Sequence, residues 1–184
     1  PGTHEGLMSS DDDGRAIADA LDARRRADRL DPFGFSGWLG REPHGAAKSD
    51  SGTVRDGVFA EQVVEMFDDL GSSSSDGPWL AVASFVNPHD IAFAGGLYEL
   101  LIGRPGTDDT VPDIDAAPSQ SDSFAGRPAC QQRFTEVWPQ MVAPQPTDLA
   151  YRQLYCYLHQ LVDAAIGRIL DALERSGMAD DTIV

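Results

Sequence analysis

The chain has 184 residues, which is enough for one domain with a core of its own. Hydrophobic residues make up 41% of it and charged residues 24%, as in ordinary globular proteins. Its formal net charge of −16 argues against nucleic acid and against an anionic membrane surface as partners. No run of the sequence approaches the roughly 18 apolar residues that a membrane span needs, so we expect no membrane partner.

Three stretches have the residue pattern of amphipathic helices. Residues 15–30 carry a thin apolar stripe, and residues 54–70 carry a broader one that is followed by Gly71. The longest stretch, residues 149–176, repeats apolar residues at steps of three and four and is followed by Gly177. Glycine commonly follows the last turn of a helix. The pattern therefore predicts a helix in each of the three stretches.

The most informative stretch, residues 79–90, lies between the second and third predicted helices and reads WLAVASFVNPHD. Its continuous apolar run, bounded by Pro78 and Pro88, predicts a buried strand that is covered on both faces, as in a parallel sheet. Residues 182–184 are β-branched and predict the start of another strand. The order of helices and strands predicts an α/β fold with a mostly parallel sheet covered by helices.

Residues 91–147 form a long connection that is rich in proline. Within it, residues 103–147 have prolines at 105, 112, 118, 128, 139, 144 and 146. Proline at this density argues against long helices and central strands, because proline lacks the backbone N–H that both need. A loop of this length in a compact domain is often functional, so we expect it to lie near the site and shape substrate access.

Candidate functional residues gather where the predicted strand ends. His89 stands at its carboxyl end, where open α/β sheets bind ligands, and a histidine titrating near neutrality can donate a proton or a hydrogen bond. From the residues alone, the favoured alternative is a histidine that only closes the strand end through backbone hydrogen bonds. Asn87 and Asp90 flank it and are candidates to orient its ring or to contact a substrate. A turn-forming role is an equal alternative for Asn87. His44 and Lys48 are candidates for the substrate side, with a plain loop position as the alternative for His44.

Two segments carry a resemblance to a known family. PWLAVASFVNPHD, residues 78–90, resembles the sulfatases of the alkaline phosphatase superfamily, in which an apolar strand runs into N-P-H-D. IGRILDALERSGMADDTIV, residues 166–184, is similar to that family's long helix and following strand. The resemblance covers residues 31–184 and implies part of an alkaline-phosphatase-like sandwich. We expect residues 1–184 to be an incomplete central part of a single catalytic domain, with residues 1–30 outside the resemblance.

The resemblance implies a sulfuric ester hydrolase that cleaves a small-molecule sulfate monoester with a formylglycine nucleophile and Ca²⁺. It also implies that His89 faces the sulfate and its bridging oxygen. The C/S-x-P-x-R motif from which formylglycine forms is absent, because Gln-Gln-Arg follows Cys130 and Tyr-Leu-His follows Cys156. We therefore expect the nucleophile and metal ligands to lie outside this segment. We expect the segment alone to be inactive, to bind no Ca²⁺ tightly and to aggregate through exposed strand edges and apolar faces.

Two other functions stay open at this point. A phosphonate or phosphate ester hydrolase of the same superfamily would use His89 in the same way, since both kinds of ester present a tetrahedral group. A non-catalytic binding domain would keep the fold without the nucleophile. The sequence indicates neither an oligomeric state nor a particular sulfate ester.

Overall fold

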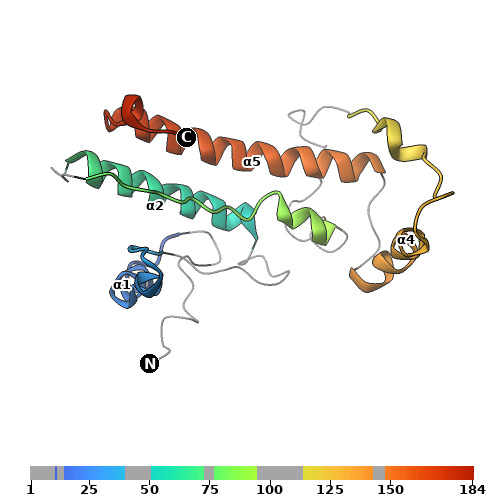
Figure 1. Cartoon of the computed structure of the whole chain (residues 1–184), viewed down its shortest axis with the longest axis horizontal. Helices are drawn as coiled ribbons and strands as arrows, with labels where there is room; N and C mark the ends of the chain where they lie inside the picture. Colours follow the sequence, from blue (N-terminus) through green and yellow to red (C-terminus); the bar gives the residue numbers. More distant parts are fainter. Residues whose placement is uncertain (1–10, 12–14, 40–50, 73–76, 95–113, 143–147) are drawn as a thin grey trace. The chain divides into compact units, whose positions relative to one another are not determined.

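The computed structural model describes residue 11 and residues 15–39, 51–72, 77–94, 114–142 and 148–184. The chain divides into two compact units, residues 1–86 with 161–184 and residues 87–160. The elements are α1 (Ala18–Ala27), η1 (Asp31–Phe33), α2 (Gly52–Ser72), η3 (His89–Phe93), η4 (Pro118–Ser121), α4 (Ala129–Val142), α5 (Asp148–Arg175) and η5 (Ala179–Asp181) (Figure 1). Among the described residues, no helix combines the length and apolar character needed to span a membrane.

The predicted parallel α/β sheet is wrong for the part of the chain that the structure describes. Helices are its regular elements, and none of the described residues forms a strand. Of the residues predicted as strands, 79–86 and 182–184 have no regular secondary structure, and 87–90 form a turn and the start of η3. A strand requires a neighbouring strand to pair its backbone N–H and C=O groups, and the described residues supply none. Apolar composition made these segments suitable for a sheet, but pairing decides whether a sheet exists.

The predicted helix at residues 54–70 is confirmed as α2, which begins two residues earlier. Ser51 starts it, because its carbonyl oxygen accepts the N–H of Arg55 at 2.9 Å and its hydroxyl oxygen accepts the N–H of Thr53 at 3.1 Å. A serine in this position satisfies one of the donors that a helix start leaves unpaired. At the other end the helix continues past Gly71 to Ser72, whose hydroxyl donates to the carbonyl oxygen of Asp68 at 2.7 Å.

The long helix predicted at residues 149–176 is confirmed as α5, Asp148–Arg175. Gly177 follows it with φ +76°, a left-handed conformation that other residues adopt only with strain. The hydroxyl of Ser176 donates to the carbonyl oxygen of Leu173 at 2.6 Å, which satisfies one of the last carbonyls. The stop that the glycine predicted is therefore the one observed.

The helix predicted at residues 15–30 is confirmed in its central part as α1, Ala18–Ala27. Arg24, on its inner side, is 1% exposed and lies over the ring of Trp38 at 5.1 Å from the guanidinium carbon to the ring centroid. Arg29 lies over the same ring at 5.3 Å. These cation–π contacts hold the segment after α1 against the helix.

The core of the first unit lies between α2 and the second half of α5. Phe67, Ala172 and Leu173 are buried together, and the Trp79 ring centroid lies 5.5 Å from that of Phe67. Arg168 joins the two helices by donating from Nη2 to the carbonyl oxygen of Gly57 at 3.3 Å. Figure 1 shows this half of α5 beside α2, with residues 78–86 running along α2. The apolar segment before His89 is thus packed on the helices of its unit.

Helix α4 corrects the expectation that the proline-rich connection would contain no long helix. It spans Ala129–Val142 with Pro139 inside it. Pro128 precedes the first turn, where a backbone N–H has no intrahelical partner, so proline costs little there. The interval from Pro128 to Pro139 leaves room for about three helical turns. Whether a helix forms in this connection therefore depends on the spacing between prolines and not on their overall density.

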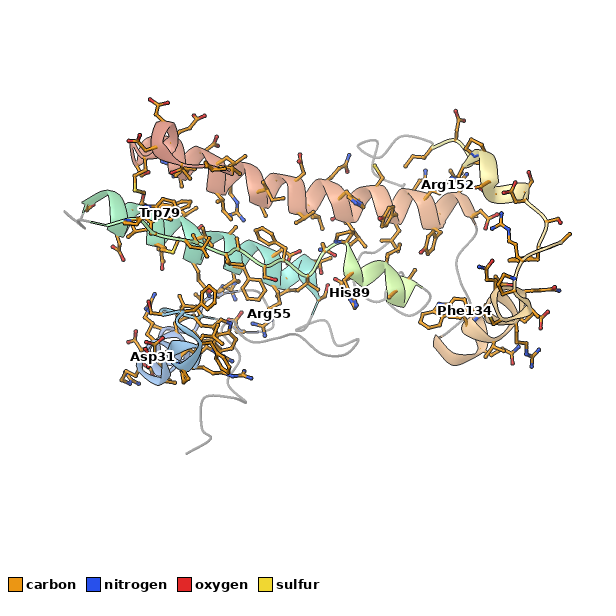
Figure 2. All side chains as sticks on the ribbon, in the orientation of Figure 1. Asp31, Arg55, Trp79, His89, Phe134 and Arg152 are labelled. Atoms are coloured by element: carbon orange, nitrogen blue, oxygen red, sulfur yellow. The ribbon has the colours of Figure 1, made fainter. Side chains whose placement is uncertain are left out.

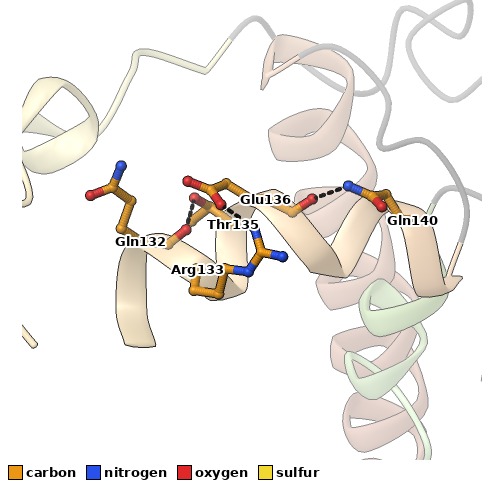
Figure 3. Close-up of polar contacts among 5 residues, drawn as sticks. All are labelled: Gln132, Arg133, Thr135, Glu136 and Gln140. Atoms are coloured by element: carbon orange, nitrogen blue, oxygen red, sulfur yellow. Dashed lines mark hydrogen bonds and ion pairs between the residues drawn. The ribbon is translucent and has the colours of Figure 1, made fainter. Parts of the chain in front are cut away.

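Polar side chains of α4 support the helix along its exposed surface. Nη1 of Arg133 lies 2.7 Å from Oε2 of Glu136, one turn further on. Side chains of the same helix also donate to its own carbonyl oxygens, Thr135 to Gln132 at 2.8 Å and Gln140 to Glu136 at 2.8 Å (Figure 3). These local contacts, together with helix-forming residues, offset the hydrogen bond that Pro139 cannot make.

Candidate functional site

His89 opens the short helix η3, and its side chain is exposed (Figure 2). The polar side chains on either side of it are buried, since Asn87 and Asp90 are each only 5% exposed. The chain thus presents one imidazole from a turn whose other polar side chains are buried. His44 and Lys48, the remaining predicted site residues, lie outside the described residues.

The turn that carries His89 is fixed to α5 on its downstream side. The N–H of Ile91 donates to the carbonyl oxygen of Pro88 at 3.1 Å and closes the first turn of η3. Ile91 then packs on a buried cluster of Ala94, Leu154 and Leu158, whose three members are 0% exposed. Leu154 and Leu158 are one helical turn apart on α5. Burial of these apolar side chains holds η3 in place while His89 stays open to solvent.

In the first unit, the end of the apolar segment 78–86 is bonded to α2. The backbone N–H of Val86 donates to Oδ1 of Asp56, on α2, at 2.7 Å. Asp56 is 2% exposed, although carboxylates are rarely buried so deeply unless they are hydrogen-bonded. Sequence reasoning missed Asp56, because an acidic residue among the apolar positions of a helix is normally assigned to the solvent face. The burial of Asp56 and its long-range contact with Val86 are visible only in the structure.

Polar burial at the start of α2 extends beyond Asp56. Ser51, Arg55 and Asp56 are all at most 2% exposed, and each has further interactions. Arg55 and Asp56 supply opposite charges on consecutive residues. A buried charge is tolerated when it is paired or hydrogen-bonded. The start of α2 is therefore buried and held by polar contacts, and it is not a solvated helix end.

The proline-rich connection is tied to the start of α5 within the second unit. Arg152 donates from Nε to the carbonyl oxygen of Ile114 at 2.9 Å and from Nη1 to Oε1 of Gln120 at 2.9 Å (Figure 2). The side-chain amide of Gln120 in turn donates to the carboxylate of Asp148. These contacts place residues 114–120 along the first turns of α5. The predicted role of the connection in substrate access stays a prediction.

The family model for sulfatases matches residues 17–184. The chain belongs to the sulfatase family. The match includes α2, the segment with N-P-H-D and α5, so the resemblance drawn from residues 31–184 is confirmed and begins further upstream. The family is one of hydrolases. No curated protein and no solved structure matches the chain.

Sulfatases are generally associated with Ca²⁺ and formylglycine, and the described residues of this sulfatase chain do not fit either group. No cluster of three or more His, Cys, Asp or Glu side chains suited to a metal ion occurs among them. Cys130 and Cys156 are free thiols, and neither belongs to a C/S-x-P-x-R motif. His89 is an exposed imidazole among these residues, and an imidazole can donate a proton or a hydrogen bond.

Proposed function

We propose that the full-length protein of this sulfatase chain hydrolyses a small sulfate monoester and that His89 acts on the oxygen that leaves. The observation that carries the proposal is an exposed histidine on a short helix that packs on α5 through Ile91, within the family match. In hydrolysis an attacking oxygen forms a bond to sulfur while the bond from sulfur to the bridging oxygen breaks, and negative charge develops on the bridging oxygen. His89 donates a proton to that oxygen, so the product leaves as a neutral alcohol and the sulfuryl group stays on the attacking oxygen.

The neighbours of His89 have a supporting role in this proposal. The burial of Asn87 and Asp90 favours the orientation of the turn over direct contact with a substrate in solvent. His44 and Lys48 stay the proposed contacts on the substrate side. We place the formylglycine and the Ca²⁺ ligands outside the described residues, because these contain neither the motif nor a suitable cluster.

Substitution of His89 tests the proposal in the complete natural protein. With p-nitrophenyl sulfate as substrate, His89→Ala is expected to lower kcat by roughly 10²-fold or more, the usual contribution of a general acid. The matched control is His159→Ala, because His159 is also an exposed histidine and its Nδ1 lies 2.8 Å from the carbonyl oxygen of Tyr155 on its own helix. This control is expected to keep the parent kcat.

Two outcomes would contradict the proposed function. If His89→Ala kept the kcat of the parent protein, His89 would not be the proton donor. A higher kcat/KM for p-nitrophenyl phosphate or for a phenyl phosphonate ester than for the sulfate would show that the protein is a phosphate or phosphonate ester hydrolase. Comparing the three esters at one pH distinguishes the substrate question from the question of His89.

A further inference from the structure

A cavity of about 220 Å³ lies between α1 and α2, within the first unit. Its wall from α2 includes Val58, Glu61, Gln62 and Glu65, which share one helix face because they are three and four residues apart. Leu21 of α1 also lines it. A cavity of roughly 150 Å³ can already bind benzene, so this space admits a small organic ligand.

Gln62 brings an unsatisfied polar group to this cavity. The residue is 8% exposed, and its Nε2 has no hydrogen-bond acceptor among the described residues. A buried donor without a partner costs free energy, and native proteins contain few such groups. The last torsion of a glutamine side chain is soft, so the amide can turn its N–H groups toward the cavity. A ligand with an acceptor oxygen would therefore satisfy Gln62.

The two carboxylates at the cavity already have positively charged partners. Oε2 of Glu61 lies 3.8 Å from Nη1 of Arg168, and Oε2 of Glu65 lies 3.8 Å from Nη2 of Arg25. An ionised carboxylate has about four acceptor positions, so each can accept a further N–H from a ligand. A cationic ligand would compete with the arginines, and an anionic one would be repelled by the carboxylates. The cavity therefore favours a neutral ligand.

The rest of the wall is suited to an alkyl group. Leu21 and Val58 are each 6% exposed, and apolar groups that contact such side chains are removed from water. We propose that this cavity binds a small neutral amide that carries a branched alkyl group. The carbonyl oxygen of the amide accepts from Gln62, its N–H donates to Glu61 or Glu65, and its alkyl group packs on Leu21 and Val58. This binding does not depend on the proposed role of His89.

Isovaleramide is the probe, and saturation-transfer difference NMR measures its binding to the complete natural protein. We expect saturable binding with a Kd of about 1–10 mM, which is ordinary for a ligand of about seven non-hydrogen atoms. Isovalerate has nearly the same shape with a negative charge, and acetamide lacks the branched alkyl group. Each is expected to bind at least about 5-fold more weakly. No saturation up to about 50 mM isovaleramide, or equal affinity for isovalerate, would overturn the inference.

Substitution of Gln62 tests the donor. Gln62→Leu keeps a side chain of similar size and is expected to weaken isovaleramide binding about 3- to 10-fold, the size of one hydrogen bond. Its melting temperature is expected to equal or exceed that of the parent, because the unpaired buried amide is gone. Gln131→Leu makes the same exchange at an exposed position of α4 and is expected to keep the parent Kd. An unchanged Kd in Gln62→Leu would show that the amide does not bind the ligand.

Substitution of the carboxylates tests the preference for a neutral ligand. Glu61→Gln combined with Glu65→Gln removes both negative charges and leaves Arg25 and Arg168 without these partners. Isovalerate is expected to bind this double variant at least about 3-fold more tightly than the parent, whereas isovaleramide is expected to change less. If isovalerate bound both proteins equally weakly, Glu61 and Glu65 would not set the charge of the ligand, and the proposed site would be wrong.

Discussion

At the scale of single residues, the candidate site contrasts one exposed polar side chain with buried polar neighbours. His89 is open to solvent, whereas Asn87 and Asp90 are each only 5% exposed. Burying polar groups is unfavourable unless they make hydrogen bonds, so a turn of this kind has few alternative conformations. The burial of Asn87 and Asp90 thus restricts the conformations of the turn and, with them, the position of the His89 imidazole.

Phe67 carries a stability prediction at the same scale. It is 4% exposed in the core between α2 and α5, so Phe67→Ala leaves a cavity and is expected to lower the free energy of unfolding by about 3–5 kcal/mol. The matched control is Phe134→Ala, because Phe134 is 57% exposed and its main ring contact is the stack on Trp138 at 5.1 Å. That control is expected to cost no more than about 1.5 kcal/mol.

Urea unfolding of the natural protein, followed by circular dichroism, measures both changes in phenylalanine. Equal losses of stability in the two variants would show that the packing of α2 on α5 does not provide the main core of the first unit.

At the scale of the elements, helix α5 offers two glycines with opposite expectations. Gly177 follows the helix at φ +76°, so Gly177→Ala is expected to lower local stability by about 1–2 kcal/mol through backbone strain. Gly167 lies inside the helix, and a methyl group added there meets no atom within 4 Å. Gly167→Ala is therefore expected to raise helix stability by roughly 0.5–1 kcal/mol.

Amide hydrogen exchange in the last turns of α5 measures the effect of both glycine substitutions. Faster exchange in Gly177→Ala and slower exchange in Gly167→Ala are the expected results. A change of the same sign in both variants would show that Gly177 does not end the helix through its left-handed conformation.

At the scale of the whole molecule, apolar side chains on an unpaired segment predict self-association of the isolated 184-residue chain. Leu80 is 74% exposed and Val82 is 72% exposed, on a segment without a strand partner among the described residues. Exposed apolar side chains beside unpaired backbone groups favour edge-to-edge pairing. We therefore expect the parent chain to form oligomers or aggregates at micromolar concentration.

Acidic substitutions test this prediction about association. Leu80→Glu combined with Val82→Glu is expected to shift the chain toward monomer in size-exclusion chromatography with light scattering. Ala83→Glu combined with Ser84→Glu adds the same charge at neighbouring exposed positions and is the control. An equal shift in both double variants would assign association to net charge, and a monomeric parent chain would contradict the prediction outright.

The sequence by itself determined the features that depend on local pattern. Apolar repeats of three and four residues located α2 and α5, Gly177 marked the end of α5, and the residues around His89 identified the sulfatase family. Such signals are local, because helix hydrogen bonds join residues four apart and an apolar stripe follows from the same geometry.

Only the tertiary structure decided the features that depend on distant partners. Residues 79–90 were predicted as a strand, but residues 79–86 have no regular secondary structure and His89 begins η3. Strand formation depends on pairing with a second strand, which the described residues do not supply, and not on composition alone. The contact of Asp56 with Val86 spans 30 positions, and no periodicity encodes it. The burial of Asn87 and Asp90 beside an exposed His89 likewise follows from packing on other elements, which the spacing of residues along the chain does not specify.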